Sequence, residues 1–228
     1  MSTSFPLRVK AVTIDLDGTL ADSIPDLAAA TNMMLRELGR PELPLERIKE
    51  FVGKGIPRLV ERSLARTIDG TASAEEMSRA LPVFERHYTD VNGRHSVLYP
   101  GVQEGLEEFR AMQMPLACVT NKSGRFTVPL LEQLGIAGFF EQIIGGDALP
   151  QKKPHPAQLL HACKRFGIKP AEMLMIGDSG NDAQAARAAG CPVFCVPYGY
   201  NEGQDVRKLD VDAIVPSLIE AKRLIQKA

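Results

Sequence analysis

Two aspartates, Asp15 and Asp17, follow the apolar run 9–14 with one residue between them. Side chains two positions apart on an extended chain point to the same side. Two carboxylates held that close raise each other's pKa unless a cation or a substrate compensates their charge. The pair therefore predicts a site that binds something positively charged.

Two more apolar runs end in polar residues. The run 114–119 leads into Thr-Asn-Lys at 120–122, and the run 173–176 leads into the acidic segment 177–182. A fourth segment, 152–156, places two lysines just before a helical pattern. In open parallel sheets, ligands bind beyond the carboxyl ends of the strands. If these runs are neighbouring parallel strands, we expect their polar ends to converge.

In order and spacing these pieces resemble the four motifs of the haloacid dehalogenase superfamily of phosphohydrolases. The matching stretches are DxDGT at Asp15–Thr19, a hydroxyl motif at Thr120, the lysine of KPxP at Lys153, and GDSxxD at Gly177–Asp182. The resemblance covers nearly the whole chain. It implies an α/β fold with a Rossmann-like, doubly wound parallel sheet core and an inserted helical cap domain.

The resemblance also implies catalytic roles. Phosphoryl transfer needs an in-line nucleophile, positive groups around the phosphoryl oxygens and a proton donor for the leaving group. Asp15 is the expected nucleophile, forming an aspartyl phosphate, and Asp17 is the expected general acid and base. Thr120 and the backbone N–H of Asn121 are expected to bind phosphoryl oxygens. Lys153 is expected to neutralise the charge shared by Asp15 and the phosphate.

A magnesium ion is the implied cofactor. Mg²⁺ prefers hard oxygen ligands and few protein carboxylates, with water and phosphate completing an octahedron. By resemblance its ligands are the Asp15 carboxylate, the Asp17 backbone carbonyl and the Asp178 carboxylate. Asp182 is a further metal candidate, either as a ligand, directly or through water, or as the residue that orients Asp178. An acid that only stabilises a helix start is the alternative for Asp182.

The segment between the first two motifs has helical rather than strand periodicity. Apolar stripes repeat at helical spacing over 27–38, 56–64 and 77–91. We predict a helical cap domain at 22–95, inserted into a catalytic core formed by 1–21 and 96–228. Beyond Gly101 short apolar runs alternate with helical patterns, which is typical of a doubly wound parallel sheet.

Within the predicted cap, Lys54 stands between Gly53 and Gly55. The stretch resembles the start of a dinucleotide-binding fingerprint, but Arg58 replaces its last glycine and no strand precedes it, which argues against a nucleotide. In the resembling family such a loop faces the organic end of the substrate. We expect Lys54, ahead of Arg58, to bind a substrate carboxylate; an exposed, solvated lysine is the alternative.

Composition limits the partners. The chain has 228 residues, of which 44% are hydrophobic and 24% charged, with a formal net charge of -1. That balance provides no broad basic field for nucleic acid and no polybasic patch for a membrane. We expect a small phosphorylated metabolite as partner, no nucleic acid, no membrane, and a monomer or small homo-oligomer.

The cysteines and the N-terminus indicate the compartment. The four cysteines form no CxxC pair, and reduced thiols imply a reducing environment: Cys118, Cys163, Cys191 and Cys195. No apolar stretch of signal-peptide length precedes the first predicted strand. We therefore expect a cytoplasmic protein.

Within the superfamily the chain most resembles the phosphoglycolate phosphatases. The resemblance rests on DLDGTLADS at 15–23, the loop 51–55, the stretch 87–101 and the run 152–156. It implies hydrolysis of 2-phosphoglycolate to glycolate and phosphate. The alternatives are a capped phosphatase acting on a sugar phosphate such as N-acetylmuramate 6-phosphate, a phosphomutase, and, more remotely, a non-catalytic binding scaffold.

Overall fold

A six-stranded parallel sheet forms the centre of the computed structural model, which describes residues 5–228. The strand order is β6-β5-β2-β7-β8-β9, and every neighbouring pair is parallel. The strands are β2 (Ala11–Ile14), β5 (Leu116–Val119), β6 (Gln142–Ile144), β7 (Met173–Gly177), β8 (Val193–Cys195) and β9 (Ala213–Ile214). The order runs outward from β2 in one direction and then the other, so the predicted doubly wound sheet is confirmed.

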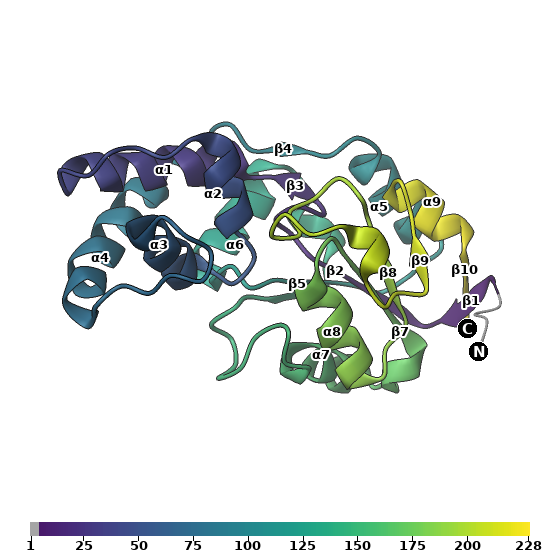
Figure 1. The fold of residues 1–228 in the computed structure, drawn as a ribbon. Coiled ribbons are helices and arrows are strands. Elements are labelled where there is room, and N and C mark those ends of the chain that lie inside the picture. The colour runs from purple at the N-terminus through teal and green to yellow at the C-terminus, as the bar shows by residue number, and fades with distance from the viewer. Residues whose placement is uncertain (1–4) are drawn as a thin grey trace.

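Helices cover both faces of this sheet (Figure 1). One face packs against α5 (Val102–Ala111), α6 (Gly124–Gln133) and α9 (Leu218–Arg223), and the other against α7 (Ala157–Phe166) and α8 (Gly180–Ala189). Burial on both faces explains why the central strands β2, β5 and β7 are largely apolar rather than alternating.

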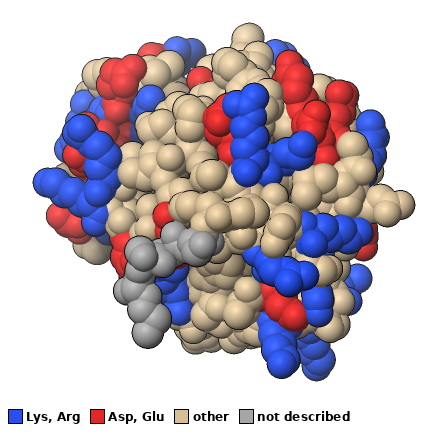
Figure 2. Space-filling model, turned by 90° about the vertical axis from the view of Figure 1, so that its right-hand side faces the viewer, with Lys and Arg blue, Asp and Glu red and all other residues tan. Residues whose placement is uncertain are grey.

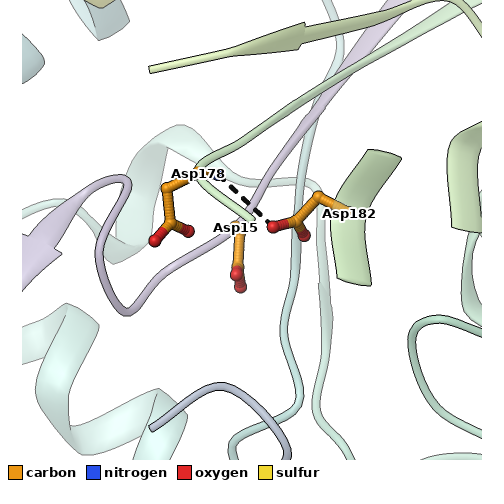
Figure 3. A group of neighbouring side chains, drawn as sticks. All are labelled: Asp15, Asp178 and Asp182. Atoms are coloured by element: carbon orange, nitrogen blue, oxygen red, sulfur yellow. Dashed lines mark hydrogen bonds between the residues drawn. The ribbon is translucent and has the colours of Figure 1, made fainter. Parts of the chain in front are cut away.

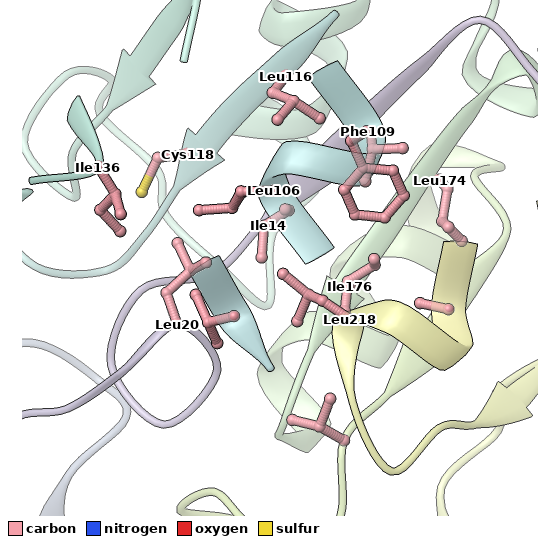
Figure 4. Packing of buried hydrophobic residues seen from close by; sticks show 14 of the residues in the cluster. Ile14, Leu20, Leu106, Phe109, Leu116, Cys118, Ile136, Leu174, Ile176 and Leu218 are labelled. Carbon is pink, nitrogen blue, oxygen red and sulfur yellow. The ribbon is translucent and has the colours of Figure 1, made fainter. Parts of the chain in front are cut away.

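Alternate side chains of each strand enter different apolar clusters. In β2, Val12 and Ile14 join the cluster under α5 and α9, whereas Ala11 joins the cluster under α7 and α8. In Figure 4, Ile14 lies among Phe109 and other fully buried side chains from separate elements. The packing fixes β2 between its neighbours and so fixes the point where its polar end emerges.

Four helices form the body at the other end of the molecule (Figure 1). They are α1 (Ile24–Glu37), α2 (Leu45–Phe51), α3 (Ile56–Ala65) and α4 (Ala74–Val91). They share an apolar cluster that also receives Phe126 and Tyr200 from the sheet-containing part. The separate cluster supports the predicted division into a cap at 22–95 and a core at 1–21 and 96–228, which stays a prediction. Residues 1–4 of that core lie outside the described residues.

Helix boundaries follow local signals. Ser23 is the N-cap of α1, and a proline follows in its first turn, where its fixed φ suits a helix start. Ser73 and Glu76 form a capping box at the start of α4. Helix α2 is not anticipated by the apolar stripes, because a helix of two turns is too short to show a clear period.

Short strand pairs join the larger parts. β3 (Ala21–Asp22) pairs antiparallel with β4 (Val97–Leu98), so the chain entering the cap and the chain leaving it lie side by side. β1 (Leu7–Val9) pairs parallel with β10 (Ile225–Lys227) at the end opposite the cap. Among residues 5–228, three single turns of 3-10 helix complete the elements: η1 (Ala137–Phe139), η2 (Pro170–Glu172) and η3 (Val206–Lys208).

Charged side chains of both signs are interspersed on the face that carries the two termini (Figure 2). Within residues 5–228, no helix combines the length and the apolar character that crossing a bilayer requires. All four cysteines are buried and free: Cys118, Cys163, Cys191 and Cys195.

Candidate active site

The polar ends of three adjacent strands meet at one edge of the sheet. Asp15 directly follows β2, Thr120 directly follows β5, and Asp178 directly follows β7. β2 lies between β5 and β7, where the strand order changes direction. This switch point is the usual ligand site of open α/β sheets, so the predicted convergence of these chain segments is observed.

Three carboxylates form an acidic cluster at this edge. Asp15, Asp178 and Asp182 each offer a ligand atom, and these atoms lie within 4.8 Å of one another. Figure 3 shows the three side chains gathered at the strand ends. Hard oxygen atoms at such spacing form a set that could hold a divalent cation.

Asp178 is held from two sides. The Thr19 hydroxyl donates to its Oδ1 at 3.0 Å, and the Tyr200 backbone N–H donates to its Oδ2. Burial raises the pKa of Asp178 well above its ordinary value, and the neighbouring Asp182 and Asp15 raise it further. The carboxylate is therefore oriented by the protein but lacks a compensating positive charge.

The turn after β2 needs a glycine beside Asp178. Gly18 has a φ of 87°, in the left-handed region. A Cβ at Gly18 would stand 2.3 Å from Asp178 Oδ2. Glycine thus allows both the turn and the close approach of backbone to carboxylate.

Lys153 supplies the positive charge beside Asp15, the predicted nucleophile. Its Nζ lies 3.0 Å from Asp15 Oδ1 and 2.6 Å from Asp182 Oδ1, and it donates to the Val119 carbonyl at 2.7 Å. Burial alone would lower the pKa of Lys153, but Asp15 and Asp182 outweigh it and raise the pKa. Lys153 is therefore a fixed cation, 2% exposed, whose three N–H groups each have an acceptor.

The pKa of the Asp15 carboxyl is raised above its ordinary value. Burial raises its pKa from 3.8 to about 7; Lys153 lowers it, while Asp182 and Asp17 raise it. The backbone N–H of Leu16 donates to Asp15 Oδ1 at 2.7 Å. One oxygen is thereby bound by the protein.

Asp182 makes hydrogen bonds through both carboxylate oxygens. Oδ2 accepts from the N–H groups of Asp178 and Ser179 and from the Ser179 hydroxyl, which completes the capping box of α8. Oδ1 accepts from Lys153. Asp182 therefore accepts hydrogen bonds at the start of α8 and from Lys153; its roles in orienting the Asp178 carboxylate and in ligating a metal stay predictions.

Asp17 stands apart from the acidic cluster and has its own partners. The Ser23 hydroxyl donates to its Oδ1 at 2.5 Å, and Lys122 Nζ lies 2.9 Å from Oδ1 and 3.2 Å from Oδ2. Ser23 is at the entry to the cap and Lys122 follows β5. The proposed acid and base is thus held at the junction of the two parts.

Thr120 and Asn121 lie where the sequence predicts phosphate binding. Thr120 is 1% exposed, and its Oγ1 accepts from the Lys122 N–H at 3.2 Å. Asn121 Nδ2 donates to the carbonyls of Gly53 and Lys153, each at 2.9 Å. Asn121 therefore links the cap loop to the segment that carries the buried lysine.

Lys54 lies on the cap side with a more open environment. Its side chain is 44% exposed, and its Nζ is 3.7 Å from Glu202 Oε2. The Gly53 carbonyl next to it contacts Asn121 and Asn181, so the loop rests on the core. The predicted role of Lys54 in binding a substrate carboxylate stays a prediction.

Comparison with known proteins identifies the family of this site. The model of the haloacid dehalogenase-like hydrolases matches residues 9–190, which include all four motif stretches and the whole helical insert. The chain belongs to the haloacid dehalogenase-like hydrolase family. The predicted family is therefore confirmed.

Relatives in this hydrolase family match over almost their full length. A phosphoglycolate phosphatase of Nitrosospira multiformis is 58% identical, covering 98% of this chain and 99% of its own. One of Thiobacillus denitrificans is 53% identical, covering 99% of each. The crystal structure of a predicted phosphoglycolate phosphatase from Haemophilus somnus has a TM-score of 0.88 and 34% identity, covering 93% of this chain and 96% of that one.

Two site residues of this hydrolase were not singled out from the sequence. Lys122 stands in the polar run after β5, but its proximity to Asp17 depends on β5 lying beside β2. Tyr200, which binds Asp178 through its N–H and Asp22 through its hydroxyl, carries no motif. The polar run 120–122 at the end of an apolar run is the sequence pattern that points to Lys122. No local pattern points to Tyr200.

Proposed function

We propose that this hydrolase is a Mg²⁺-dependent phosphomonoesterase that converts 2-phosphoglycolate to glycolate and phosphate through an aspartyl phosphate on Asp15. The observation that carries the proposal is the placement of the acidic cluster beside the buried Lys153 at the sheet's switch point. The phosphoglycolate phosphatases that match almost the whole chain at up to 58% identity support the substrate.

The first step transfers the phosphoryl group to Asp15. An Asp15 oxygen attacks phosphorus, and the bond from phosphorus to the ester oxygen breaks with its electron pair on the leaving oxygen. Asp17 gives that oxygen a proton, so the leaving oxygen of glycolate departs as a neutral hydroxyl group. Lys153 and the groups at Thr120 and Asn121 stabilise the charge on the phosphoryl oxygens.

The second step releases phosphate. Asp17, now a carboxylate, takes a proton from a water molecule that attacks phosphorus in the aspartyl phosphate. The bond between phosphorus and Asp15 breaks, which restores the Asp15 carboxylate and frees inorganic phosphate. The cap limits access of other water while the intermediate exists.

The acidic cluster fits the proposed Mg²⁺. Its donors are carboxylate oxygens, and the pKa values of Asp15 and Asp178 are raised first by burial and then by the neighbouring carboxylates, both of which a bound cation would offset. Asp15 and Asp178, with the Asp17 backbone carbonyl, are the proposed ligands. When bound, the ion neutralises charge on the phosphoryl oxygens and on the attacking carboxylate.

A cytoplasmic location is part of the same proposal. All four cysteines are free and buried in the fold, as expected for a protein that works in a reducing compartment. The proposed partner is a small phosphorylated metabolite.

A phosphate-release screen tests the substrate. The purified protein with Mg²⁺ is assayed on short phosphoacids and sugar phosphates, including N-acetylmuramate 6-phosphate, and kcat/KM values are compared. We expect 2-phosphoglycolate to give the highest kcat/KM. A sugar phosphate that exceeds it by roughly tenfold or more would overturn the assignment.

A second measurement tests the catalytic role of Asp15. We expect Asp15→Asn to reduce Mg²⁺-dependent phosphate release by ~10³-fold or more, since the nucleophile is removed. Asp147→Asn is the matched control, because Asp147 lies in a loop of the same face and binds the Gly124 N–H instead. A binding scaffold without catalysis would show no loss on changing Asp15.

A further inference from the structure

Lys122 is a buried cation that the steps above leave without a role. Its side chain is only 2% exposed. Its Nζ lies 2.9 Å and 3.2 Å from the two oxygens of Asp17 and 4.9 Å from the ring centre of Tyr88 in the cap helix α4. The ammonium group thus sits where core and cap meet, on the side of the acid rather than of the nucleophile.

The contact between Lys122 and Asp17 places the ammonium group relative to the reacting atoms. Lys153 contacts Asp15 and serves the phosphoryl group, whereas Lys122 contacts Asp17, which must reach the ester oxygen. In 2-phosphoglycolate a single CH₂ joins the ester oxygen to the carboxylate. A substrate placed for protonation by Asp17 therefore carries its carboxylate into the surroundings of the Lys122 ammonium.

Charge balance favours that contact. An ammonium removed from water is costly unless carboxylates or other acceptors surround it. A lysine has three N–H donors, and Asp17 provides two oxygens. When Asp17 turns to the ester oxygen, Lys122 needs another anionic acceptor, and a substrate carboxylate provides it. A phosphate ester with a neutral organic group offers no such anionic acceptor to Lys122.

Two cap cations that could compete for the substrate have other partners. Arg62 is 2% exposed, and it donates to the carbonyls of Phe51 and Ile68 and to Glu202. Lys54 is 44% exposed and pairs loosely with the same glutamate. Glu202 thus offsets both charges on the cap side, whereas Lys122 faces the proposed acid.

We infer that Lys122 determines specificity: its ammonium binds the carboxylate of the substrate's leaving group, beside the ester oxygen that Asp17 protonates. The inference rests on the proposed function and adds a recognition element from the core. It assigns the selection of short phosphoacids to the residue that follows Thr120 and Asn121, with Tyr88 of the cap covering the ammonium.

The test compares 2-phosphoglycolate with ethyl phosphate, in which a methyl group replaces the carboxylate. The values of kcat/KM are measured for the wild type, Lys122→Met, Lys54→Met and the control Lys222→Met, with saturating Mg²⁺. Lys222 is a lysine of α9 that pairs with Glu108 of α5. We expect Lys122→Met to lose roughly 10- to 100-fold more kcat/KM on 2-phosphoglycolate than on ethyl phosphate, and Lys222→Met to keep the wild-type ratio.

Contrary results are distinct. Equal losses on both substrates would mean that Lys122 acts only through Asp17, and no loss on either substrate would exclude carboxylate binding; either result overturns the inference alone. Loss of the preference in Lys54→Met but not in Lys122→Met also overturns it. A wild type without preference for 2-phosphoglycolate overturns the proposed function as well.

A second pair of variants decides the question if Lys122→Met does not fold. Asp17→Asn/Lys122→Met removes both members of the buried pair, so no carboxylate is left uncompensated, and Asp17→Asn alone keeps the ammonium. Binding of both esters is measured by calorimetry with Mg²⁺. We expect the double variant to bind 2-phosphoglycolate roughly tenfold more weakly than the single variant, with ethyl phosphate unchanged. Equal affinities for 2-phosphoglycolate overturn the inference.

Discussion

Lys153 and Lys122 divide the positive charge of the site between its two sides. Lys153 contacts Asp15 and Asp182, and Lys122 contacts Asp17. Both lysines are at most 2% exposed at the side chain, so neither charge is screened by water. The proposed nucleophile and the proposed acid therefore each have a cation of their own.

The raised pKa of Asp15 predicts how metal binding depends on pH. Its pKa of about 7 means that Asp15 is mostly protonated below that pH, and a bound cation competes with that proton. We expect Mg²⁺ affinity to increase from about pH 5 through about pH 7, because Asp15 and Asp178, whose pKa values are both raised, bind the ion only when deprotonated. Titration calorimetry at constant ionic strength measures it. An affinity that is constant or falls over this range would contradict the proposed ligand role of Asp15.

The turn after β2 affects Mg²⁺ binding through Gly18, which lies against the Asp178 carboxylate. We expect Gly18→Ala to weaken Mg²⁺ binding roughly tenfold or more, because its Cβ would displace the Asp178 carboxylate. Gly39→Ala is the matched control: Gly39 has a φ of 68°, and nothing lies within 4 Å of its added Cβ. Both variants carry the strain of about 1 kcal/mol of a left-handed residue, measured by urea unfolding. Equal Mg²⁺ affinity in the two variants would contradict this account of Gly18.

The junction between cap and core depends on one carboxylate in α1. Asp26 is fully buried and accepts hydrogen bonds from the backbone N–H groups of Gly93, His95 and Ser96 and from the Ser96 hydroxyl. It thereby ties the segment leaving the cap to the helix that enters it. Neighbouring β3 and β4 pair just beyond this point.

We expect Asp26→Ala to lower the free energy of unfolding by about 3 to 5 kcal/mol, because several buried donors lose their acceptor. Asp90→Ala, on the exposed side of α4, serves as the control and is expected to change it by less than about 0.5 kcal/mol. Chemical denaturation followed by circular dichroism gives both values. A cost below about 1 kcal/mol for Asp26→Ala would show that other contacts hold the junction.

The elements that sequence reasoning predicts best are the long or strongly apolar ones. Strands β2, β5 and β7 are apolar runs with polar ends, and α4 has a long stripe of apolar residues. The two-residue strands β3 and β4 are too short to show a period, so they emerge only when the cap segments are placed side by side. Sequence reasoning also does not find the role of Asp26, because its hydrogen-bond partners lie almost seventy positions away along the chain.

The cap and the core share an apolar cluster beside the site. The cap cluster includes Phe126 and Tyr200 from the core, and Tyr200 also binds Asp178. Motif spacing predicts Asp15, Lys153 and Asp178 because these residues belong to recognisable local patterns. Lys122 and Tyr200 depend on which strands and loops become neighbours, and a single sequence does not state that directly.

The proposed mechanism requires an aspartyl phosphate on Asp15, and trapping this intermediate tests the mechanism directly. The enzyme is mixed with 2-phosphoglycolate radiolabelled in its phosphoryl group, quenched in acid, and digested for mass spectrometry. We predict a Mg²⁺-dependent, hydroxylamine-labile phosphate on the peptide that contains Asp15, and none in Asp15→Asn. Undiminished turnover in Asp15→Asn, or the label on another residue, would contradict the account.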